Sequence, residues 1–370
     1  MPLSTILVLD GETFFARKVV RSLAYAGRWR IHVLARSGGE AHAGLEWSRH
    51  VEEFHAVDEG VSDEQYVDAV ERAVRRSGAL MVLPVIESTA LFCIRHREAL
   101  LRFTRLAPLP TEESFSTAID KGRLAGLLAR HNIPHPATCL ADASNFSRVR
   151  MPVLLKPRRS FGGRGIQKIE TFPQLATELS RCAPSKFCVQ EHVEGSDAGC
   201  SVLAVNGELL AWTTQYGVRH TASFSAHAEV LMDACAPVLE ITKRLVRALN
   251  WSGVANIDFR LDTSGCAQVL EVNGRYWNSL LASTLAGVNF PDLVCRLSLG
   301  ERTPPPRQRS GRFVHPRTYF RDTLRSVPGR SRTPWTGLSM TLSDPLPELC
   351  SALQLRGSAL SAHGVRPAVL

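Results

Sequence analysis

The chain of 370 residues is too long for one simple core, so we expect two or three domains. Its 44% hydrophobic and 21% charged residues are ordinary for a soluble globular protein. No apolar run approaches the roughly 18 residues of a membrane-spanning helix, and the N-terminus lacks the basic start and cleavage site of a secretory signal. The nine cysteines are never spaced as CxxC. This pattern favours buried, reduced thiols in a cytoplasmic protein over a disulfide framework, a zinc site or a catalytic nucleophile.

The net charge of +9 belongs to one segment rather than to the whole chain. Residues 301–332 contain nine arginines and two acids, so the rest of the chain carries only about +2. This distribution argues against nucleic-acid binding by the main body. Phe313, Tyr319 and Phe320 lie among the arginines and would suit stacking against bases. Binding of an anionic partner is therefore an alternative, although we favour a packed C-terminal extension.

The first hundred residues alternate between short apolar runs and stretches with helical spacing. This rhythm predicts a parallel sheet with helices on both faces. The turn at residues 10–14 has one glycine where a dinucleotide-binding fingerprint needs three, which disfavours a nicotinamide or flavin cofactor. It either lines a substrate pocket or is a plain tight turn. The expected strands are residues 6–9, 31–34, 54–57 and 80–83, and the expected helices are residues 14–26 and 66–76.

The middle of the chain predicts a mixture of helices and antiparallel strands. Asn206 and Gly207 form a favoured two-residue hairpin turn between two extended runs. A proline-rich linker at residues 303–307 ends the pattern, and only a short helix over residues 346–355 is expected beyond it. The expected helices are residues 120–131, 172–181 and 236–249, with two short helices ending by residue 299. The expected strands are residues 152–157, 166–169, 187–191, 201–205, 208–216, 254–261 and 267–272.

A glycine-rich loop, residues 156–165, lies between two of these strands. Its glycines let backbone N–H groups approach phosphate oxygens, and its cations supply counter-charge. Alone, the loop is a weak signal, and a bland β-turn is the better interpretation of it. Lys156 strengthens the phosphate reading, because a lysine that ends an apolar strand must find a polar partner or be desolvated at a cost of several kcal/mol. Lys121, at the start of a predicted helix, could reach the same anion.

An acidic cluster is the strongest chemical signal. Glu271 and Asn273 are two residues apart on one predicted strand and therefore share a face. Asp258 lies on the preceding strand. Carboxylate and amide oxygens are the ligands that Mg²⁺ takes, together with phosphate oxygens. The alternative is an exposed polar face of an edge hairpin, and the apolar neighbours Ile257 and Val272 argue against it.

These motifs, in this order, closely resemble the ATP-grasp superfamily over residues 6–300, and residues 271–279 are similar to members related to the carbamoyl-phosphate synthase large subunit. The resemblance implies an α/β (α+β) fold, in which a parallel βα pre-ATP-grasp domain precedes a two-lobed ATP-grasp domain and a basic C-terminal extension. We could place no family counterpart for the extension. The implied domains are residues 1–110, residues 111–300 with lobes of about 111–190 and 191–300, and residues 301–370.

The resemblance also implies ATP and Mg²⁺ (or Mn²⁺) as cofactors, with a role for each matching residue. Gly274 replaces the proline usual after the metal-binding asparagine, and Asp258 is the metal ligand that the family pattern requires least. The matching positions are Lys121 and Lys156 for the phosphates; Ser160, Gly162, Gly163 and Gly165 for the flap; Glu191, His192 and Val193 for the adenine; Asp197, preferred over Glu194, for the ribose; Asp258, Glu271 and Asn273 for the metal; and Arg275 for the transferred phosphoryl group.

The expected activity is that of an ADP-forming carboxylate–amine ligase acting on small molecules, with Arg275 and Lys156 as catalytic residues. The alternatives are an ATP-binding regulatory protein without turnover and a binder of anionic partners through residues 301–332. Nucleic acid is disfavoured, no transmembrane segment is expected, and a homodimer is one option for the assembly. Substrate contacts are expected from residues 11–14, 87–88 and 215–225, with Arg219, His220 and Arg260 as candidates for holding a substrate carboxylate.

Overall fold

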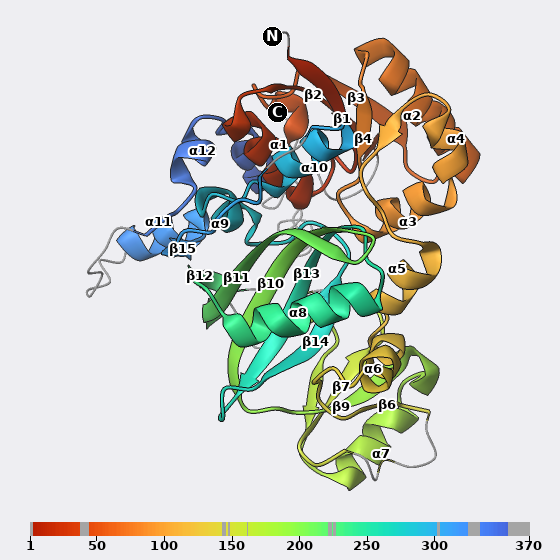
Figure 1. Cartoon of the computed structure of the whole chain (residues 1–370), viewed down its shortest axis with the longest axis vertical. Helices are drawn as coiled ribbons and strands as arrows, with labels where there is room; N and C mark the ends of the chain where they lie inside the picture. Colours follow the sequence, from red (N-terminus) through yellow and green to blue (C-terminus); the bar gives the residue numbers. More distant parts are fainter. Residues whose placement is uncertain are drawn as a thin grey trace, which may run out of the picture. The chain divides into compact units, whose positions relative to one another are not determined.

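The computed structural model describes residues 3–37, 44–142, 146, 149–160, 162–220, 224, 227–301, 304–324 and 334–353. The chain forms two compact units (Figure 1). The first combines Met1–Ala107, Pro291–Thr303 and Gly337–Leu370, and the second combines Pro108–Phe290 and Pro304–Thr336. The domains predicted from the sequence are consecutive stretches, whereas each unit joins segments that are distant along the chain. Among the described residues, no helix has the length and apolar character needed to cross a membrane.

The first unit is built on a five-stranded sheet in the order β3-β2-β1-β4-β5, with parallel pairing throughout. This confirms the predicted βα alternation. Ile6, Leu7 and Val8 are fully buried, as expected for a central strand covered on both faces. The strands are β1 (Ser4–Val8), β2 (Trp29–Ser37), β3 (Glu53–Asp58), β4 (Met81–Leu83) and β5 (Arg105–Leu106), and the helices are α1 (Phe14–Ala26), α2 (Asp63–Ser77), α3 (Glu87–Arg95) and α4 (Arg97–Leu101).

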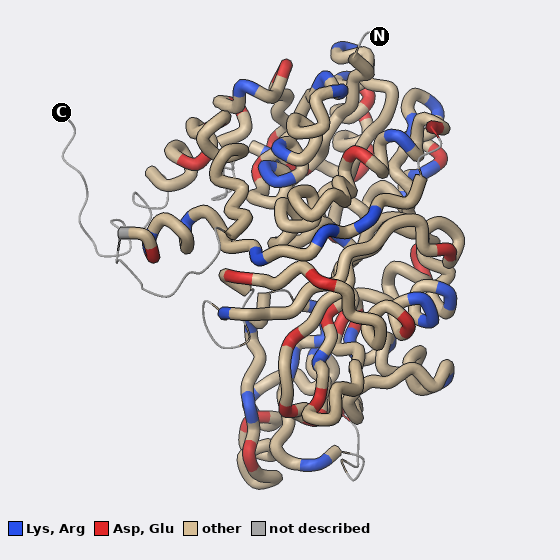
Figure 2. The backbone as a smooth tube through the Cα atoms, turned by 60° about the vertical axis from the view of Figure 1, so that its left-hand side comes forward, with Lys and Arg blue, Asp and Glu red and all other residues tan. Residues whose placement is uncertain are grey.

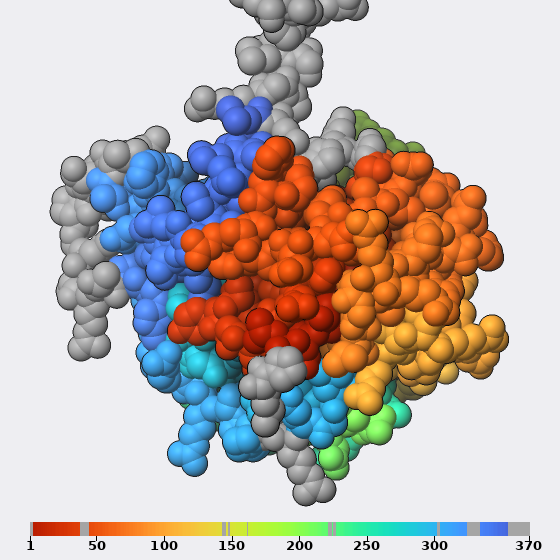
Figure 3. Space-filling view, turned by 90° about the horizontal axis from the view of Figure 1, so that it is seen from above, coloured from red at the N-terminus to blue at the C-terminus, as the bar shows by residue number. Residues whose placement is uncertain are grey.

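Segments from the C-terminal third complete the first unit. Helix α10 (Phe290–Ser298) is tied to β2 by a hydrogen bond from the Trp29 indole to Asp292, 2.8 Å long. Helix α12 (Leu338–Leu342) and a further helical stretch lie beside the β1–α1 region (Figure 3). There, Arg17 and Arg21 of α1 both pair with Glu348. The predicted helix at 346–355 is present over residues 346–353, and its last two residues lie outside the described part.

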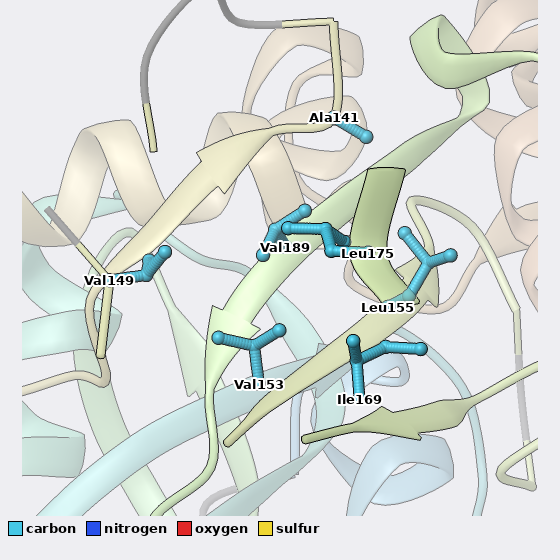
Figure 4. Close-up of a cluster of buried hydrophobic side chains, with 7 residues drawn as sticks. All are labelled: Ala141, Val149, Val153, Leu155, Ile169, Leu175 and Val189. Atoms are coloured by element: carbon cyan, nitrogen blue, oxygen red, sulfur yellow. The ribbon is translucent and has the colours of Figure 1, made fainter. Parts of the chain in front are cut away.

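The smaller sheet of the second unit has four antiparallel strands in the order β6-β9-β7-β8. Val153 and Leu155 of β7 point into a buried cluster with Ile169, Leu175 and Val189 (Figure 4). Because side chains alternate along a strand, Lys156 lies on the opposite face from this cluster. The strands are β6 (Thr138–Leu140), β7 (Val153–Pro157), β8 (Gln167–Ile169) and β9 (Phe187–Glu191), with helices α6 (Lys121–Arg130) and α7 (Phe172–Ser180).

The larger sheet of the second unit has six antiparallel strands in the order β14-β13-β10-β11-β12-β15. Helix α8 (Ala236–Ala248) lies across one face of it (Figure 1). The predicted turn is confirmed, with Asn206 and Gly207 both at positive φ. The strands are β10 (Gly195–Val205), β11 (Glu208–His220), β12 (His227–Met232), β13 (Gly253–Asp262), β14 (Ala267–Asn273) and β15 (Gly311–Val314), with α5 (Glu112–Ala118), α9 (Leu280–Leu285) and α11 (Pro316–Leu324) completing the unit.

Part of the basic segment packs onto this larger sheet. Strand β15 pairs with β12, and Arg312 pairs with Glu229, whose side chain is 2% exposed. Asp322 of α11 pairs with Arg219 at 2.6 Å. Acidic and basic positions are interspersed along the described backbone (Figure 2). In the described residues, these two pairs therefore tie the segment to the sheet, one through its Arg312 and the other through its Asp322.

Candidate active site

The three predicted metal ligands meet on one face of the larger sheet. Asp258 of β13 lies opposite Glu271 of β14 in the strand register. The Asn273 amide donates to the Asp258 carboxylate at 3.0 Å and to the Glu271 carboxylate at 3.4 Å. Arg275 donates to the side-chain oxygen of Asn273 at 3.0 Å. The structure thus brings Asp258, Glu271, Asn273 and Arg275 into one hydrogen-bonded set.

Local strand geometry explains this convergence. The residues that flank Asp258, Ile257 and Phe259, are 1% exposed and point to the other face of the sheet. The register shifts between Asp258 and Phe259, so that Leu270 is an extra residue on β14. Such a bulge re-aims the side chains beside it. Here it places Glu271 directly opposite Asp258.

The electrostatics of the Asp258 and Glu271 carboxyl groups favour a bound cation. Burial, reinforced by the neighbouring Glu271 carboxylate, raises the pKa of Asp258 well above its ordinary value. Burial opposes ionisation of Glu271 as well, but the nearby Lys121 and Lys156 outweigh it and lower the pKa of Glu271. Two adjoining, partly buried carboxyl groups resist carrying two negative charges unless a cation lies between them. The oxygen donors of this set fit a hard divalent cation such as Mg²⁺.

Two buried lysines accompany the acidic set. Lys121 and Lys156 are each 5% exposed. The Lys121 ammonium lies 3.0 Å from the Glu271 carboxylate and 3.4 Å from the Ser160 carbonyl oxygen. The Lys156 ammonium donates to the Gln190 side chain at 2.6 Å, and burial lowers the pKa of Lys156. Lysines are almost never fully buried without a counter-charge, so this pair fits an anionic ligand.

The start of α6 fixes the position of Lys121. Asp120 caps the helix by accepting hydrogen bonds from the backbone N–H groups of Gly122 and Arg123. The same carboxylate pairs with Arg158 at 3.0 Å, and the Lys121 N–H donates to the Arg158 carbonyl. These contacts hold the first turn of α6 against the end of β7. Lys121 and Lys156, which are 35 positions apart in the sequence, are therefore held in the same region of the second unit.

The glycine-rich loop connects β7 to β8, as the sequence predicts. Gly162, Gly163 and Gly165 all have positive φ, between 64° and 75°, a conformation that side chains with a Cβ rarely adopt. A Cβ on Gly163 would lie 2.1 Å from the Phe224 carbonyl oxygen. The loop therefore lies close to the segment that follows β11. Phe161, expected to be part of the same flap, lies outside the described residues.

A matched pair of substitutions tests the importance of this close approach. Gly163→Ala is expected to displace the loop and to weaken ATP binding roughly tenfold, because alanine meets both an unfavourable φ and the Phe224 carbonyl. Gly162→Ala meets a similar φ but no atom within 4 Å, so a smaller effect is expected. Nucleotide titration of both variants provides the measurement. Equal affinities in the two would contradict the argument.

The predicted adenine-binding hinge follows β9. The Glu191 N–H donates to the Ala137 carbonyl at 2.8 Å, and the His192 N–H donates to the Pro152 carbonyl at 3.0 Å. Both donors are thus used inside the smaller sheet. Adenine recognition by Glu191, His192 and Val193 stays a prediction, and it would have to use the Glu191 carbonyl and the Val193 backbone.

Asp197 lies in a polar cluster that the sequence did not reveal. Its carboxylate pairs with Arg260 at 2.6 Å, His220 at 2.8 Å and His227 at 3.1 Å. The two imidazole rings are 4.3 Å apart. Strand register places Asp197 opposite Arg260, on the same face as Asp258 by alternation. The ribose role of Asp197 stays a prediction, and its carboxylate is shared here among three cationic or polar partners.

The three candidates for a substrate carboxylate have different surroundings. Arg219 pairs with Asp322 at 2.6 Å and with Glu229 at 3.5 Å, both of which are buried. Its charge is therefore already offset by two carboxylates. His220 and Arg260 instead share the single carboxylate of Asp197. Of the three candidates, His220 and Arg260 are therefore better suited than Arg219 to bind an additional anion.

Sequence reasoning missed two residues that position the chemistry. Gln190 is 4% exposed and accepts the hydrogen bond from Lys156. Asn256 donates to Asp258 at 2.8 Å and accepts from the Ser201 hydroxyl at 3.0 Å. The alternation that placed Glu271 beside Asn273 also places Asn256 beside Asp258, so Asn256 could have been found from the same signal. Gln190 offered none, because its partner lies on another strand.

In the first unit, the two segments expected to contact substrate lie side by side. Asp10 is 2% exposed and accepts hydrogen bonds from the N–H groups of Val85 and Ile86 and from the Thr89 hydroxyl. Burial raises the pKa of Asp10 to about 6. This buried carboxyl group fixes the turn after β1 to the start of α3, where Glu87 lies.

Comparisons with known proteins agree with this fold. Residues 184–318 match the family described as "ATP-grasp in the biosynthetic pathway with Ter operon". This match continues past residue 300 and includes β15, which corrects the expectation that the segment after residue 299 has no family counterpart. The sequence predicts no strand at β15, because a short strand needs only a pairing partner and no hydrophobic period.

Sequence relatives point in the same direction. The carbamoyl phosphate synthase large chain of Thermoanaerobacter sp. (strain X514) is 27% identical over 272 residues, which are 68% of this chain and 24% of that protein. The vancomycin/teicoplanin A-type resistance protein VanA of Enterococcus faecium is 28% identical over 173 residues, which are 40% of this chain and 50% of that protein. The chain thus spans between a quarter and a half of the length of these two relatives.

Solved structures share the architecture. N5-carboxyaminoimidazole synthetase from Staphylococcus aureus, solved with ADP, has a TM-score of 0.66 at 13% identity. The matched region covers 84% of this chain and 82% of the synthetase chain. The parallel sheet, the two antiparallel sheets and the matching family together determine the classification. The chain thus has the fold of ATP-grasp proteins, and its residues 184–318 match an ATP-grasp family.

Proposed function

We propose that this protein is an ATP- and Mg²⁺-dependent ligase that activates a small-molecule carboxylate for attack by an amine, releasing ADP and phosphate. The observation that carries the proposal is the convergence of two buried lysines on the set Asp258, Glu271 and Asn273. A purely structural ion network would gain little from burying two ammonium groups beside two carboxyl groups, because desolvation offsets most of the attraction. A ligand that is both polyanionic and metal-bound matches the two lysines through its negative charge and the acidic set through its metal ion.

Each residue has a defined task in this proposal. Lys121 and Lys156 hold the phosphates of ATP, and the loop of Ser160, Gly162, Gly163 and Gly165 covers them. Glu271 and Asn273 hold the metal, with Asp258 on the same or a second ion. When bound, the metal neutralises charge on the transferred phosphoryl group. Arg275 stabilises charge that develops during transfer, and phosphoryl transfer depends mainly on such positioning and neutralisation.

The chemistry then balances in two steps. A carboxylate oxygen of the substrate attacks the γ-phosphorus of ATP, the bond to the β-phosphate oxygen breaks, and ADP leaves. The amine attacks the resulting acyl phosphate at carbon, phosphate leaves, and the amine gives up its proton as the amide forms. Exclusion of water by the glycine-rich flap protects the acyl phosphate from hydrolysis. His220 and Arg260, beside Asp197, are suited to hold an anionic group of a substrate.

A substrate survey tests the proposal. ADP release is followed by a coupled assay across amino acids and small carboxylates, alone and combined with amines, with AMP detection as a control. ADP that forms only when a carboxylate and an amine are both present is the expected result. Tight MgATP binding without turnover for any pair would instead favour an ATP-binding regulatory protein. Turnover that yields AMP would contradict the proposed chemistry.

A further inference from the structure

Three metal-ligating side chains meet in the first unit, in a part of the fold that the proposed reaction does not use. His32 lies near the start of β2, and Glu53 and His55 lie at the start of β3. The parallel register pairs His32 with Glu53, and His55 follows two residues later on the same face. Among the described residues, His32, Glu53 and His55 form one of two groups whose ligand atoms lie close enough to hold one ion.

The distances within this group suit a shared ion better than direct hydrogen bonds. His32 Nδ1 lies 3.8 Å and His55 Nε2 lies 3.7 Å from the same Glu53 oxygen, and both distances are beyond normal hydrogen-bond range. The two ring nitrogens are 3.4 Å apart, which is a long hydrogen bond. A point equidistant from all three atoms lies about 2.1 Å from each. Zinc–nitrogen and zinc–oxygen bonds in proteins are about 2.0–2.2 Å long. The trio therefore has the dimensions of a metal-binding triangle.

The chemistry of the donors agrees with the dimensions. His32 is 5% exposed, and each of the two imidazole rings offers a ring nitrogen, a common kind of zinc ligand in proteins. Arg76 of α2 pairs with the other oxygen of Glu53 at 2.5 Å. That contact orients the carboxylate and leaves its second oxygen toward the histidines, as outer partners of metal ligands commonly do.

The second group of possible metal ligands, Asp197, His220 and His227, has different contacts. His220 and His227 contact the Asp197 carboxylate at hydrogen-bond distances of 2.8 Å and 3.1 Å. Arg260 supplies a positive charge to the same carboxylate at 2.6 Å. That group is a satisfied ion and hydrogen-bond network. In the His32 group, the carboxylate oxygen that faces the two rings has no contact with them at hydrogen-bond distance.

We propose that His32, Glu53 and His55 bind one divalent transition-metal ion of the Zn²⁺ class, with a fourth position open to water. Two imidazole nitrogens and one carboxylate oxygen suit such an ion and not Mg²⁺, which prefers oxygen ligands alone. The cysteines play no part, in keeping with their scattered spacing. Because β3 is an edge strand of the parallel sheet, the ion would fasten that edge to β2 and stabilise the first unit.

Zinc titration of the full chain, stripped of metal and kept in excess Mg²⁺, tests this proposal. The variants are His55→Ala and Glu53→Gln, and His220→Ala is the matched control from the second group. One equivalent of Zn²⁺ is expected to bind to the unmodified chain and to His220→Ala, and to raise their midpoints of thermal unfolding. Loss of a ligand is expected to weaken binding by at least about 10–100-fold and to abolish the thermal shift. Co²⁺ bound to the unmodified chain should show no thiolate charge-transfer band.

Four outcomes would overturn the proposal. These are the absence of stoichiometric zinc binding, binding that survives in both His55→Ala and Glu53→Gln, loss of binding in His220→Ala, and a thiolate band with Co²⁺. If His55→Ala does not fold, Glu53→Gln and the Co²⁺ spectrum of the unmodified chain still decide the question. Because the readouts are zinc affinity and thermal stability, the result is independent of whether the protein ligates a carboxylate to an amine.

Discussion

Replacing Lys156 with methionine is expected to lower ADP release by roughly 10²–10³-fold, the loss typical when one preorganised electrostatic group is removed from an active site. Methionine keeps the length and apolar stem of lysine without its charge. The Lys156 ammonium is buried and contacts the neutral Gln190 side chain, so its burial costs free energy that the fold alone does not recover. The midpoint of thermal unfolding should therefore stay within a few degrees of the unmodified protein.

This combination of lost activity and retained stability separates a functional lysine from a structural one. Lys168→Met is the matched control, because Lys168 lies on β8 of the same sheet and is 40% exposed. Its activity and stability are expected to match the unmodified protein. MgATP affinity, measured by titration, gives a readout that needs no acceptor substrate. Unchanged affinity and turnover in Lys156→Met would remove Lys156 from the site.

Replacing Glu271 with glutamine is expected to lower ADP release by about 10²-fold or more and to weaken the dependence of ATP binding on Mg²⁺. The substitution keeps the shape of the side chain but removes an anionic metal ligand, and even losses outside the ligand set cost 10–100-fold. It also removes the carboxylate that lies 3.0 Å from the buried Lys121 ammonium. Thermal stability should therefore fall as well. Breaking a fully buried pair by removing one partner costs about 3–5 kcal/mol, and a smaller loss is expected here because the Glu271 side chain is 23% exposed.

A double variant separates the two effects. Lys121→Met combined with Glu271→Gln removes both charges, so it is expected to unfold at a higher temperature than Glu271→Gln alone while remaining inactive. Glu170→Gln, an exposed acid on the smaller lobe, serves as the control and should retain full activity. A double variant less stable than the single one would mean that Lys121 and Glu271 are not energetically coupled. Full turnover in Glu271→Gln would reject the metal site.

Part of the candidate site could be predicted from the sequence because its signals are local. Glu271 and Asn273 share a face through the two-residue period of a strand, and Lys156 is a charge at the end of an apolar run. The glycines of the flap mark backbone that side chains would strain. Each of these inferences needs only the neighbouring residues, and the hydrophobic runs of the first unit predicted its parallel sheet for the same reason.

The remaining features depend on contacts that no local pattern encodes. Strand β15 exists because β12 offers it a pairing edge and Glu229 offers Arg312 a counter-charge. The network around Asp197 forms because β10, β11, β12 and β13 pair in one register, which brings together residues up to 63 positions apart in the sequence.

The sequence itself thus identified the acidic cluster, the two lysines and the glycine-rich flap, through strand periodicity and the free-energy cost of burying charge. Only the tertiary structure decided that Lys121 faces Glu271, that Gln190 and Asn256 support the site, and that His32 and His55 converge on Glu53. The physical reason is that each of these pairings is set by sheet register and by packing between distant segments. Sheet register and long-range packing cannot be read from the order of residues within a single helix or strand.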